Sequence, residues 1–408
     1  MKVDFWLWSI LAKLCQGMVI GEQIPLSSDS IMFSDSSQTF MDEMFGDIVN
    51  TEYSKSHRQK LLLEGVSAGG EVKQQYMPML SLKLPGDDDT SDIIKNFSLF
   101  GGIVTYSHLP SFNCFDPQLY DREIDVAIVG APFDTGTSYR PGARFGPDAI
   151  RSASKRLGPS KSKHNYTIVD CGDVSMSPFD NRVALNQLYR GHRAIHQHKR
   201  SSVPKIITMG GDHTITLMAL RSAYEQHGKQ LRVIHFDSHI DTWNPLVLGG
   251  GISEYMSLNH GTFLHYAHEL GYIQKSGNWH VGMRAPYIDD EYDEKHDAEC
   301  GFKVISARDI DTLGARGISK LLKKLVGSDP VYITVDIDVL DPAFAPGTGT
   351  MEAGGFSTRE LLTILDGLQG IRLIGADVVE VSPPFDTNAG ITSLAATDVI
   401  SSFLKLIN

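Results

Sequence analysis

Three short clusters of His and Asp residues combine metal-binding side chains with close spacing. They read Gly210-Gly211-Asp212-His213, Asp237-Ser238-His239-Ile240-Asp241 and Asp336-Ile337-Asp338. Carboxylates gathered in one place repel one another and resist burial unless cations neutralise them. Two divalent cations would balance the four aspartates of the second and third clusters. Oxygen and imidazole donors without thiolate suit Mn²⁺ and do not exclude Zn²⁺, Co²⁺ or Ni²⁺. The clusters therefore predict a centre that holds two metal ions.

Each cluster directly follows a short apolar run that is typical of a β-strand. Strands are expected at 125–130, 205–209, 231–236, 279–282, 302–306, 331–335 and 371–378. They alternate with amphipathic segments, and Ser357 with Glu360 forms a capping box that predicts a helix. This pattern favours a three-layer α/β/α fold with a mainly parallel sheet. The carboxyl ends of parallel strands meet at one crevice, so the three clusters should converge there.

The spacing within two of the clusters predicts how their side chains point. Asp237, His239 and Asp241 recur at every second residue, as do Asp336 and Asp338. An extended backbone projects such residues to one side. We therefore expect extended chain at both places.

The clusters and their flanks, 235–241 and 334–342, resemble the signatures of the arginase and agmatinase (ureohydrolase) family. Segments 132–147 and 346–355 are similar to the agmatinase branch in particular, and the resemblance covers 121–408. It implies two Mn²⁺ ions per subunit and a homo-oligomer, a trimer or a hexamer. One ion would be held by His213, Asp237, Asp241 and Asp336, and the other by Asp237, His239, Asp336 and Asp338.

The resemblance also implies roles for residues around the metals. His260, within Asn259-His260-Gly261-Thr262-Phe263, matches the proton shuttle, and Glu380 matches the carboxylate that binds the substrate guanidinium. Asp241 would orient the bridging hydroxide. Asp212 and His235 match no ligand position, and Asp212 could instead orient a metal-bound imidazole.

The implied reaction is hydrolysis of a guanidino compound. Two metals that share a water lower its pKa enough to present hydroxide, which attacks the guanidinium carbon. The products would be urea and a primary amine. Agmatine is the favoured substrate, which would give putrescine for polyamine biosynthesis. The alternatives are 4-guanidinobutanoate and free guanidine, with formiminoglutamate less favoured, and Ile240 and Asn259 depart from the family pattern beside functional residues.

Two function classes outside this family are also open. A binuclear metal phosphoesterase uses a similar metal pair, but it would need basic residues to clamp phosphate, and Glu380 stands beside these motifs instead. A non-catalytic, metal-stabilised secreted binding protein would have lost a ligand or the shuttle, whereas the set here is complete.

Composition places broad limits on the partners of the chain. Its 408 residues include 37 Lys and Arg against 49 Asp and Glu, a net charge of -12 that argues against nucleic acid as a partner. Hydrophobic residues at 41% and charged residues at 21% are ordinary for a globular protein. The four cysteines have no paired short spacing, which argues against a disulfide scaffold and against a thiolate zinc site.

The N-terminal region differs from the rest of the chain. Residues 1–21 resemble a secretory signal peptide, although Lys13 interrupts the apolar run. A secreted, membrane-free mature protein is therefore expected; the alternative is an uncleaved apolar segment in a cytoplasmic or mitochondrial protein. Residues 22–120 are expected to form an extension that is weakly structured in part, ahead of a catalytic domain at 121–408. The sequons at Asn96 and Asn165 would accept glycans in the secretory pathway.

Overall fold

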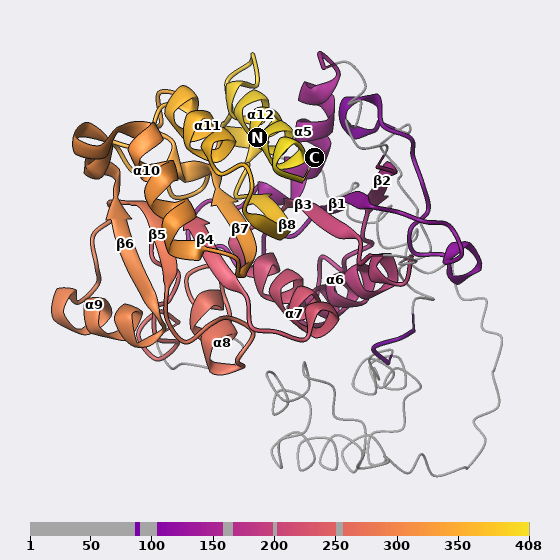
Figure 1. Cartoon of the computed structure of the whole chain (residues 1–408), viewed down its shortest axis with the longest axis horizontal. Helices are drawn as coiled ribbons and strands as arrows, with labels where there is room; N and C mark the ends of the chain where they lie inside the picture. The colour runs from indigo at the N-terminus through magenta and orange to yellow at the C-terminus, as the bar shows by residue number, and fades with distance from the viewer. Residues whose placement is uncertain (1–85, 90–103, 158–165, 199–201, 250–255, 408) are drawn as a thin grey trace, which may run out of the picture. The chain divides into compact units, whose positions relative to one another are not determined.

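The computed structural model describes residues 86–89, 104–157, 166–198, 202–249 and 256–407 (Figure 1). The expected signal peptide, most of the expected extension and the asparagines of both sequons, Asn96 and Asn165, lie outside the described residues. In the part of the chain that the structure describes, no helix is both long and apolar enough to cross a membrane.

One eight-stranded sheet forms the centre of the described domain. Its strand order is β2-β1-β3-β8-β7-β4-β5-β6, and every pair of neighbours is parallel. This confirms the predicted parallel sheet. The strands are β1 Val126–Ala131, β2 Ile168–Asp173, β3 Lys205–Gly210, β4 Arg232–Phe236, β5 Asn278–Met283, β6 Phe302–Ser306, β7 Pro330–Asp336 and β8 Arg372–Val379.

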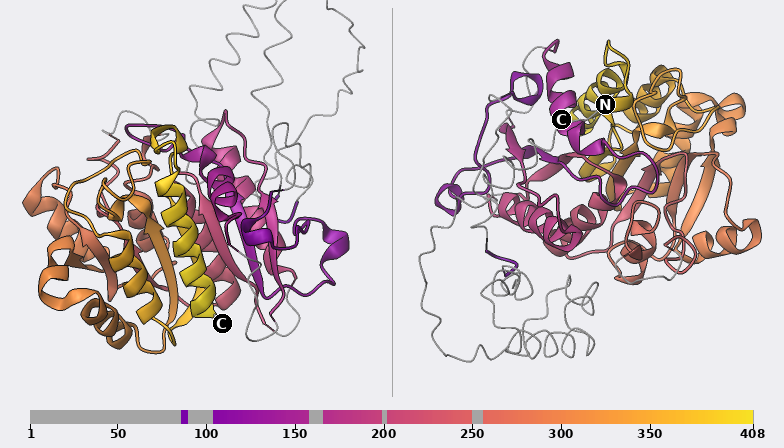
Figure 2. Two further views of the ribbon diagram at one scale, coloured as in Figure 1. Left: turned by 90° about the horizontal axis from the view of Figure 1, so that it is seen from above. Right: turned by 180° about the vertical axis from the view of Figure 1, so that it is seen from behind.

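Helices cover both faces of this sheet (Figures 1 and 2). On one face α5, α12, α11 and α10 pack against one another in that order, and on the other α6, α7 and α8 do so. Helix α9 packs against β6. The helices are α5 Gly146–Ser154, α6 Asn181–His196, α7 Thr216–His227, α8 Phe263–Glu269, α9 Asp290–Glu299, α10 Ile310–Val326, α11 Thr358–Gly367 and α12 Ile391–Ile407.

The side chains of β1 show why two helical layers are needed. Val126 and Ile128 belong to one buried apolar cluster, whereas Ala127 and Val129 belong to a second. Successive residues of a strand point to opposite faces, so each cluster fills the space between the sheet and one layer of helices. A strand buried on both faces is typical of parallel sheets. The three-layer α/β/α fold is confirmed.

All seven expected strands are present, with ends shifted by one residue or so, but β2 was not predicted. This strand lies at the edge of the sheet and carries Asp170 and Asp173 among few apolar residues. Asp170 is buried because Arg151 donates to both of its carboxylate oxygens at 2.9 Å. Asp170 makes the strand less apolar than a typical buried strand, so the sequence pattern does not reveal it. In the structure an arginine of α5 neutralises this aspartate. The capping box of Ser357 and Glu360 begins α11, as predicted.

The segment before β1 is attached to the domain by a disulfide and by a buried tyrosine. Cys114 and Cys171 are bonded, so Cys300, which is buried, is the free cysteine among the described residues. Tyr106 is fully buried, and its hydroxyl donates to the carbonyl oxygen of Thr397 at 2.8 Å. The described residues 104–120 therefore pack as part of the sheet domain.

Candidate metal centre

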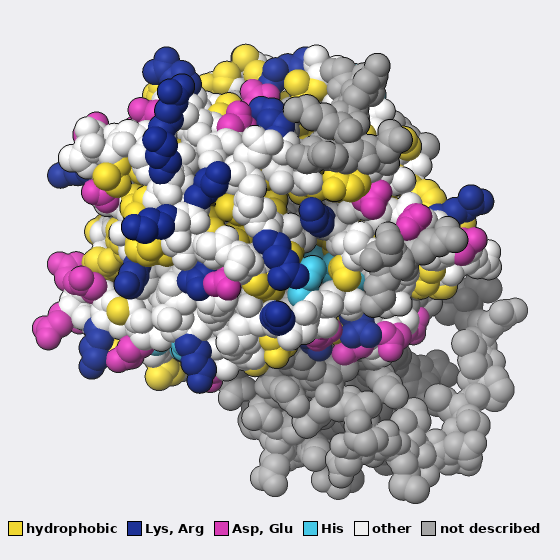
Figure 3. Space-filling view, viewed as in Figure 1, with side chains coloured by type: hydrophobic (Ala, Val, Ile, Leu, Met, Phe, Trp, Pro, Cys, Tyr) yellow, Lys and Arg dark blue, Asp and Glu magenta, His cyan; other side chains and the backbone are white. Residues whose placement is uncertain are grey.

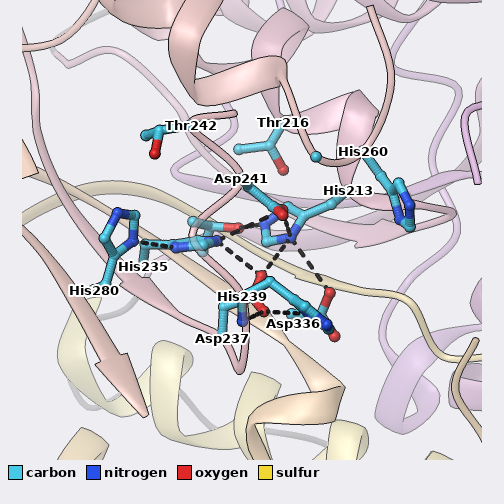
Figure 4. Close-up of polar contacts among 12 residues, drawn as sticks. His213, Thr216, His235, Asp237, His239, Asp241, Thr242, His260, His280 and Asp336 are labelled. Atoms are coloured by element: carbon cyan, nitrogen blue, oxygen red, sulfur yellow. Dashed lines mark hydrogen bonds and ion pairs between the residues drawn. The ribbon is translucent and has the colours of Figure 1, made fainter. Parts of the chain in front are cut away.

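The three acidic clusters meet beyond the carboxyl ends of β3, β4 and β7 (Figure 4). These strands lie within one stretch of the sheet, with only β8 between β3 and β7. The six side chains predicted as metal ligands, which come from three separate parts of the chain, are all brought to this place. Five of the six residues are buried, and the side chain of His239 is 16% exposed.

The first group of ligand atoms surrounds Nδ1 of His213. This nitrogen lies 3.1 Å from Oδ2 of Asp237, 3.1 Å from Oδ2 of Asp241 and 3.4 Å from Oδ2 of Asp336. The group contains the four residues that were predicted to hold the first ion.

The second group surrounds Nδ1 of His239. This atom lies 3.3 Å from Oδ1 of Asp237 and 3.1 Å from Oδ2 of Asp338. Asp237 therefore turns one carboxylate oxygen to each group, which is the arrangement a bridging ligand needs. The predicted bridging role of Asp336 stays a prediction, because its Oδ1 accepts a hydrogen bond from the backbone nitrogen of Asp338 at 2.8 Å.

The unpaired polar atoms and the gathered negative charges of these side chains fit a site for divalent cations. Nδ1 of His213 and Oδ2 of Asp237 are buried and have no hydrogen-bond partner. A buried polar atom left in this state costs about 1–3 kcal/mol. Burial, together with the negative charges of Asp338 and Asp237, raises the pKa of Asp336 well above its ordinary value. Cations at this place would satisfy the unpaired atoms and offset the repulsion between the carboxylates.

A hydroxyl group fixes the tautomer of His213. Nε2 of His213 lies 2.7 Å from Oγ1 of Thr334, which donates its own proton to Asp377 at 2.5 Å. Thr334 must therefore accept from Nε2, so Nε2 carries the proton and Nδ1 offers its lone pair to the acidic group. Hydrogen bonds of this kind orient metal-binding imidazoles and raise their basicity.

The orienting role expected for Asp212 was wrong. Its Oδ1 accepts from the backbone nitrogen of Thr214 at 2.9 Å, and its Oδ2 accepts from that of Gly136 at 2.7 Å. Asp212 therefore caps the short helix that begins at His213 and anchors the loop at Gly136. It cannot orient the His213 ring, because Thr334 already does so.

The expectation of extended chain through the clusters was also wrong in part. Asp338 lies in a short 3-10 helix, Ile337–Val339, and the backbone at Asp241 is left-handed, with φ of 52°. The side chains still converge because these turns, rather than a continuing strand, direct them inward. Glu380 has φ of 61°, so it and Asp241 are two of the four described non-glycine residues with positive φ. Such strain, about 1 kcal/mol or more each, concentrates at functional sites.

Glu380 lies between the predicted shuttle and the first ligand group. Its Oε1 is 3.0 Å from Nδ1 of His260 and accepts from the backbone nitrogen of His213 at 2.9 Å. At the opposite side of the His260 ring, Nε2 accepts a hydrogen bond from the backbone nitrogen of Ser138 at 3.1 Å. The same Nε2 lies 2.8 Å from Oγ of Ser138. His260 is thus held by hydrogen bonds at both ring nitrogens.

Two influences on the charge of His260 oppose each other. Burial disfavours the imidazolium, but the hydrogen bond and charge of Glu380, with Asp241 and Asp212, raise the pKa of His260 to about 9. The amide of Ser138, in contrast, can donate only to a neutral ring with a free Nε2. The carboxylates thus favour a proton on His260 that the Ser138 contact opposes, a balance suited to a group that takes up and releases protons.

A chain of polar contacts leads away from Asp237 into the domain. Nε2 of His235 lies 2.9 Å from Oδ2 of Asp237, and its Nδ1 is 2.7 Å from Nδ1 of His280. Nε2 of His280 lies 2.8 Å from Oδ1 of Asp297 in α9, which also accepts from Thr242 at 2.6 Å. His235 is not among the predicted ligands, and here it contacts Asp237, whose carboxylate faces both ligand groups.

Sequence reasoning missed Ser138, His280 and Asp297. Ser138 lies within the segment that resembles agmatinases, so the segment was identified but not the contact. Neither His280 nor Asp297 stands in a cluster or motif, and only the pairing of β4 with β5 brings His280 beside His235. Nothing in the sequence pattern could have indicated their roles.

The centre is close to the molecular surface. Figure 3 shows a small patch of histidine on one face of the molecule, flanked by Lys or Arg side chains and by hydrophobic groups. The side chains of His239 and His260 are 16% and 11% exposed. A small molecule could therefore reach the two ligand groups without unfolding of the domain.

Comparison with known proteins identifies relatives along most of the chain. The model of the arginase family matches residues 124–405. A Schizosaccharomyces pombe protein named "Putative agmatinase 1" is 44% identical over 79% of this chain and 86% of its own length. The guanidinobutyrase of Pseudomonas aeruginosa is 37% identical over 76% of this chain and 93% of its length. The structure of proclavaminate amidino hydrolase from Streptomyces clavuligerus has a TM-score of 0.64 and 38% identity, covering 76% of this chain and 98% of that one.

Proposed function

The chain belongs to the arginase family, and from this premise we propose that it hydrolyses a guanidino compound to urea and a primary amine. The observation that carries the proposal is the position of Asp237, whose two carboxylate oxygens each face a separate His-containing group. The six predicted ligands, the shuttle and the substrate carboxylate are all present and close together, which a protein that had lost catalysis would not need.

The side chains of the two groups would hold two divalent cations, and we propose Mn²⁺ for both. Hard oxygen donors with two imidazoles and no thiolate support this choice. When bound, such cations supply the activation of water that hydrolysis at neutral pH requires. The remaining steps fall to protein side chains.

Glu380 is the residue best placed to bind the substrate cation. Its carboxylate is 1% exposed, lies next to the first ligand group and can accept charge-assisted hydrogen bonds from an amidine. The contact with His213 fixes its position in advance, so little entropy is lost when the substrate binds.

His260 is placed to supply the proton that the departing amine needs. Its Nδ1 faces Glu380, and its Nε2 faces the hydroxyl of Ser138, which is an exposed residue. A proton can thus enter at Nε2 and leave at Nδ1 without movement of the ring. General acid catalysis of this kind contributes about 10²–10⁴-fold to a rate.

Agmatine is the substrate that we propose, with putrescine as the second product. The 44% identity to the Schizosaccharomyces pombe protein supports agmatine, and the 37% identity to a guanidinobutyrase keeps 4-guanidinobutanoate as the principal competitor. Both compounds carry the same guanidinium, so the centre described above would act on either. The choice between them depends on residues that contact the far end of the substrate.

A urea-release assay tests reaction and substrate together. The full chain would be loaded with Mn²⁺ and given agmatine, 4-guanidinobutanoate, guanidine and arginine at equal concentration. The highest kcat/KM with agmatine would support the proposal. Urea from another substrate alone would keep the reaction and replace the substrate, whereas no urea from any guanidino compound would refute the function.

We also propose that the protein works in an oxidising compartment of the secretory pathway or outside the cell. The signal-like residues 1–21 led to this expectation, and the disulfide between Cys114 and Cys171 supports it, because structural disulfides are rare in reducing compartments. Thiol labelling of the protein from its native source, before and after reduction, would test the proposal. Labelling of Cys114 or Cys171 without prior reduction would contradict it.

A further inference from the structure

A second cluster of metal-binding side chains lies between α8 and α9 and shares no residue with the centre described above. It consists of His265 in α8, His296 in α9 and Cys300, which follows α9 directly. His296 and Cys300 are four residues apart, so they lie on the same side of the helix end. The helical spacing thus places the donors of His296 and Cys300 together, and the position of α8 brings His265 beside them.

The three donor atoms are spaced as ligands of one ion would be. Nδ1 of His265 lies 3.1 Å from Nε2 of His296, which lies 3.8 Å from Sγ of Cys300, and all three atoms are within 4.8 Å of one another. Ligands at about 2.0–2.3 Å from a tetrahedral Zn²⁺ are about 3.3–3.8 Å apart. Small side-chain rotations are therefore enough to close the three donors around one ion.

The surroundings of these residues are also those of a metal site. Oε2 of Glu269 lies 3.5 Å from Nε2 of His265, the ring nitrogen that faces away from the cluster. Carboxylates in this position orient metal-binding imidazoles. His268 lies one turn along α8 from His265, and its Nδ1 is buried without a hydrogen-bond partner. An ion could use this atom as a fourth donor.

Burial keeps the His265 imidazole neutral and therefore able to donate a lone pair. Burial, together with the positive charge that His296 and His268 can carry, lowers the pKa of His265 to about 4. Burial also raises the pKa of Cys300 to about 12, so the thiol keeps its proton unless a cation replaces it. A bound metal ion deprotonates a coordinating thiol.

We propose that His265, His296 and Cys300 bind one Zn²⁺ ion, with His268 or water as the fourth ligand. One proton leaves the Cys300 thiol as the zinc–thiolate bond forms, and no oxidation or reduction takes place. The thiolate makes the site selective for Zn²⁺ over Mn²⁺, because thiolate is a soft ligand and Mn²⁺ prefers oxygen. The protein would then hold two kinds of metal in separate places.

The bound zinc would fix two helices that support the first centre. Phe263, at the start of α8, stacks on the ring of His213, with centroids 4.5 Å apart. In α9, Asp297 follows His296 directly and binds both His280 and Thr242. An ion between α8 and α9 would therefore join two walls of the first centre without contact with the substrate.

Absorption of bound Co²⁺ gives a test that does not depend on activity. Purified full-length protein, stripped of metal and titrated with Co²⁺, should show a thiolate-to-cobalt charge-transfer band in the near ultraviolet. Cys114 and Cys171 are bonded to each other, so Cys300 is the thiol that can produce it among the described residues. The variant Cys300→Ser should lose the band, and the matched control Cys15→Ser should keep it.

Further variants separate this site from the proposed hydrolase centre. Asp237→Ala should keep the cobalt band while it loses the metals of the first centre, so failure of the hydrolase proposal would leave this one standing. Glu269→Gln should bind Zn²⁺ about tenfold more weakly if the carboxylate orients a ligand. His268→Ala distinguishes a histidine from water as the fourth ligand by the change in the visible cobalt spectrum.

The result that would overturn the proposal is a wild-type protein without a thiolate band, or a band that Cys300→Ser retains. The cluster would then be a hydrogen-bonded histidine pair beside a buried thiol. Should Cys300→Ser fail to fold, His296→Asn serves as the second variant, and circular dichroism of both checks their folding. Zinc that stabilises the wild type and His296→Asn equally against heat would refute the proposal as well.

Discussion

Nδ1 of His260 lies 3.0 Å from Oε1 of Glu380, and the same oxygen accepts a hydrogen bond from the backbone of His213. One carboxylate oxygen thus connects the proposed proton carrier to the first metal-ligand group. In the proposed reaction, substrate that binds to Glu380 would compete with His260 or share this oxygen with it. Binding of the substrate and movement of the proton would then be coupled through one atom.

The variant His260→Ala should keep both metals and lose most of its activity. His260 is not among the proposed ligands, so metal content by mass spectrometry should equal that of the wild type. Urea release should fall about 10²–10⁴-fold, the usual contribution of a general acid or base. Unchanged turnover would remove His260 from its role.

The variant Glu380→Gln should lower the pKa of His260. Burial alone disfavours the charged ring, and the wild-type pKa is raised to about 9 chiefly by the hydrogen bond and charge of Glu380. With a neutral amide in place of the carboxylate, the burial effect prevails. Titration of the His260 ring by NMR in metal-free protein, assigned with His260→Asn, measures the difference; equal pKa values in both proteins would contradict it.

The same pair should make the stability of the metal-free protein depend on pH. A folded-state pKa above the unfolded value of about 6.5 contributes stability that is complete below that pH and is lost as the pH rises through about 9. Wild type should therefore lose stability relative to Glu380→Gln between these values. Urea unfolding of both proteins at pH 6 and pH 9 tests this, and a constant difference would count against the ion pair.

The variant Thr334→Val should weaken metal binding without removal of any ligand. It deletes the oxygen that accepts from Nε2 of His213, so the ring is free to turn or to change tautomer. Metal affinity should fall about 10–100-fold, as for other partners of metal-binding histidines. Thr334→Ser, which retains the hydroxyl, is the matched control. Similar affinities in the two variants would mean that Thr334 does not orient the ligand.

Asp237 and Asp338 should differ in how many metals their loss removes. Asp237 faces both ligand groups, whereas Asp338 contacts only the His239 group. Asp237→Ala should therefore lose two ions per subunit, and Asp338→Ala should lose one and retain the other. Titration calorimetry with Mn²⁺ counts the sites. Loss of a single ion from Asp237→Ala would show that it does not bridge.

Removal of the disulfide by Cys114→Ser with Cys171→Ser should destabilise the sheet domain. The bond closes a loop over a sequence separation of 57 residues, and the chain-entropy model gives about 4 kcal/mol for a loop of this length. The midpoint of denaturant unfolding should fall accordingly. An unchanged midpoint would mean that residues 104–120 are held by contacts such as that of Tyr106 rather than by the bond.

The sheet and the convergence of the six candidate ligands could be predicted because their signals are local. Apolar runs marked seven strands, and each acidic cluster directly follows one of them, so parallel topology alone brings the clusters together. The positions of Asp241 and Asp338 were predicted correctly although their backbone was not. The sequence pattern located the end of each strand. The turns that follow are too short to predict, and they direct the side chains towards one another.

The parts that could not be predicted depend on contacts between distant segments. His280 and Asp297 lie outside every motif, and β2 is hidden by the Asp170 that pairs with Arg151. The spacing of the cysteines gave no reason to expect a thiolate beside two histidines, because Cys300 meets His265 only through the packing of α8 against α9. Such groupings are properties of the tertiary structure, not of sequence spacing.

The series of polar contacts from Asp237 through His235 and His280 ends on Asp297, in a helix at the rim of the domain. A substitution on that helix would therefore alter how strongly Asp237 attracts the proposed cations, without a change in the residues that contact the substrate. Natural variation or directed evolution could tune the working pH and metal preference of the enzyme from this remote position. Residues in α9 are thus sensible targets for libraries that aim to preserve specificity.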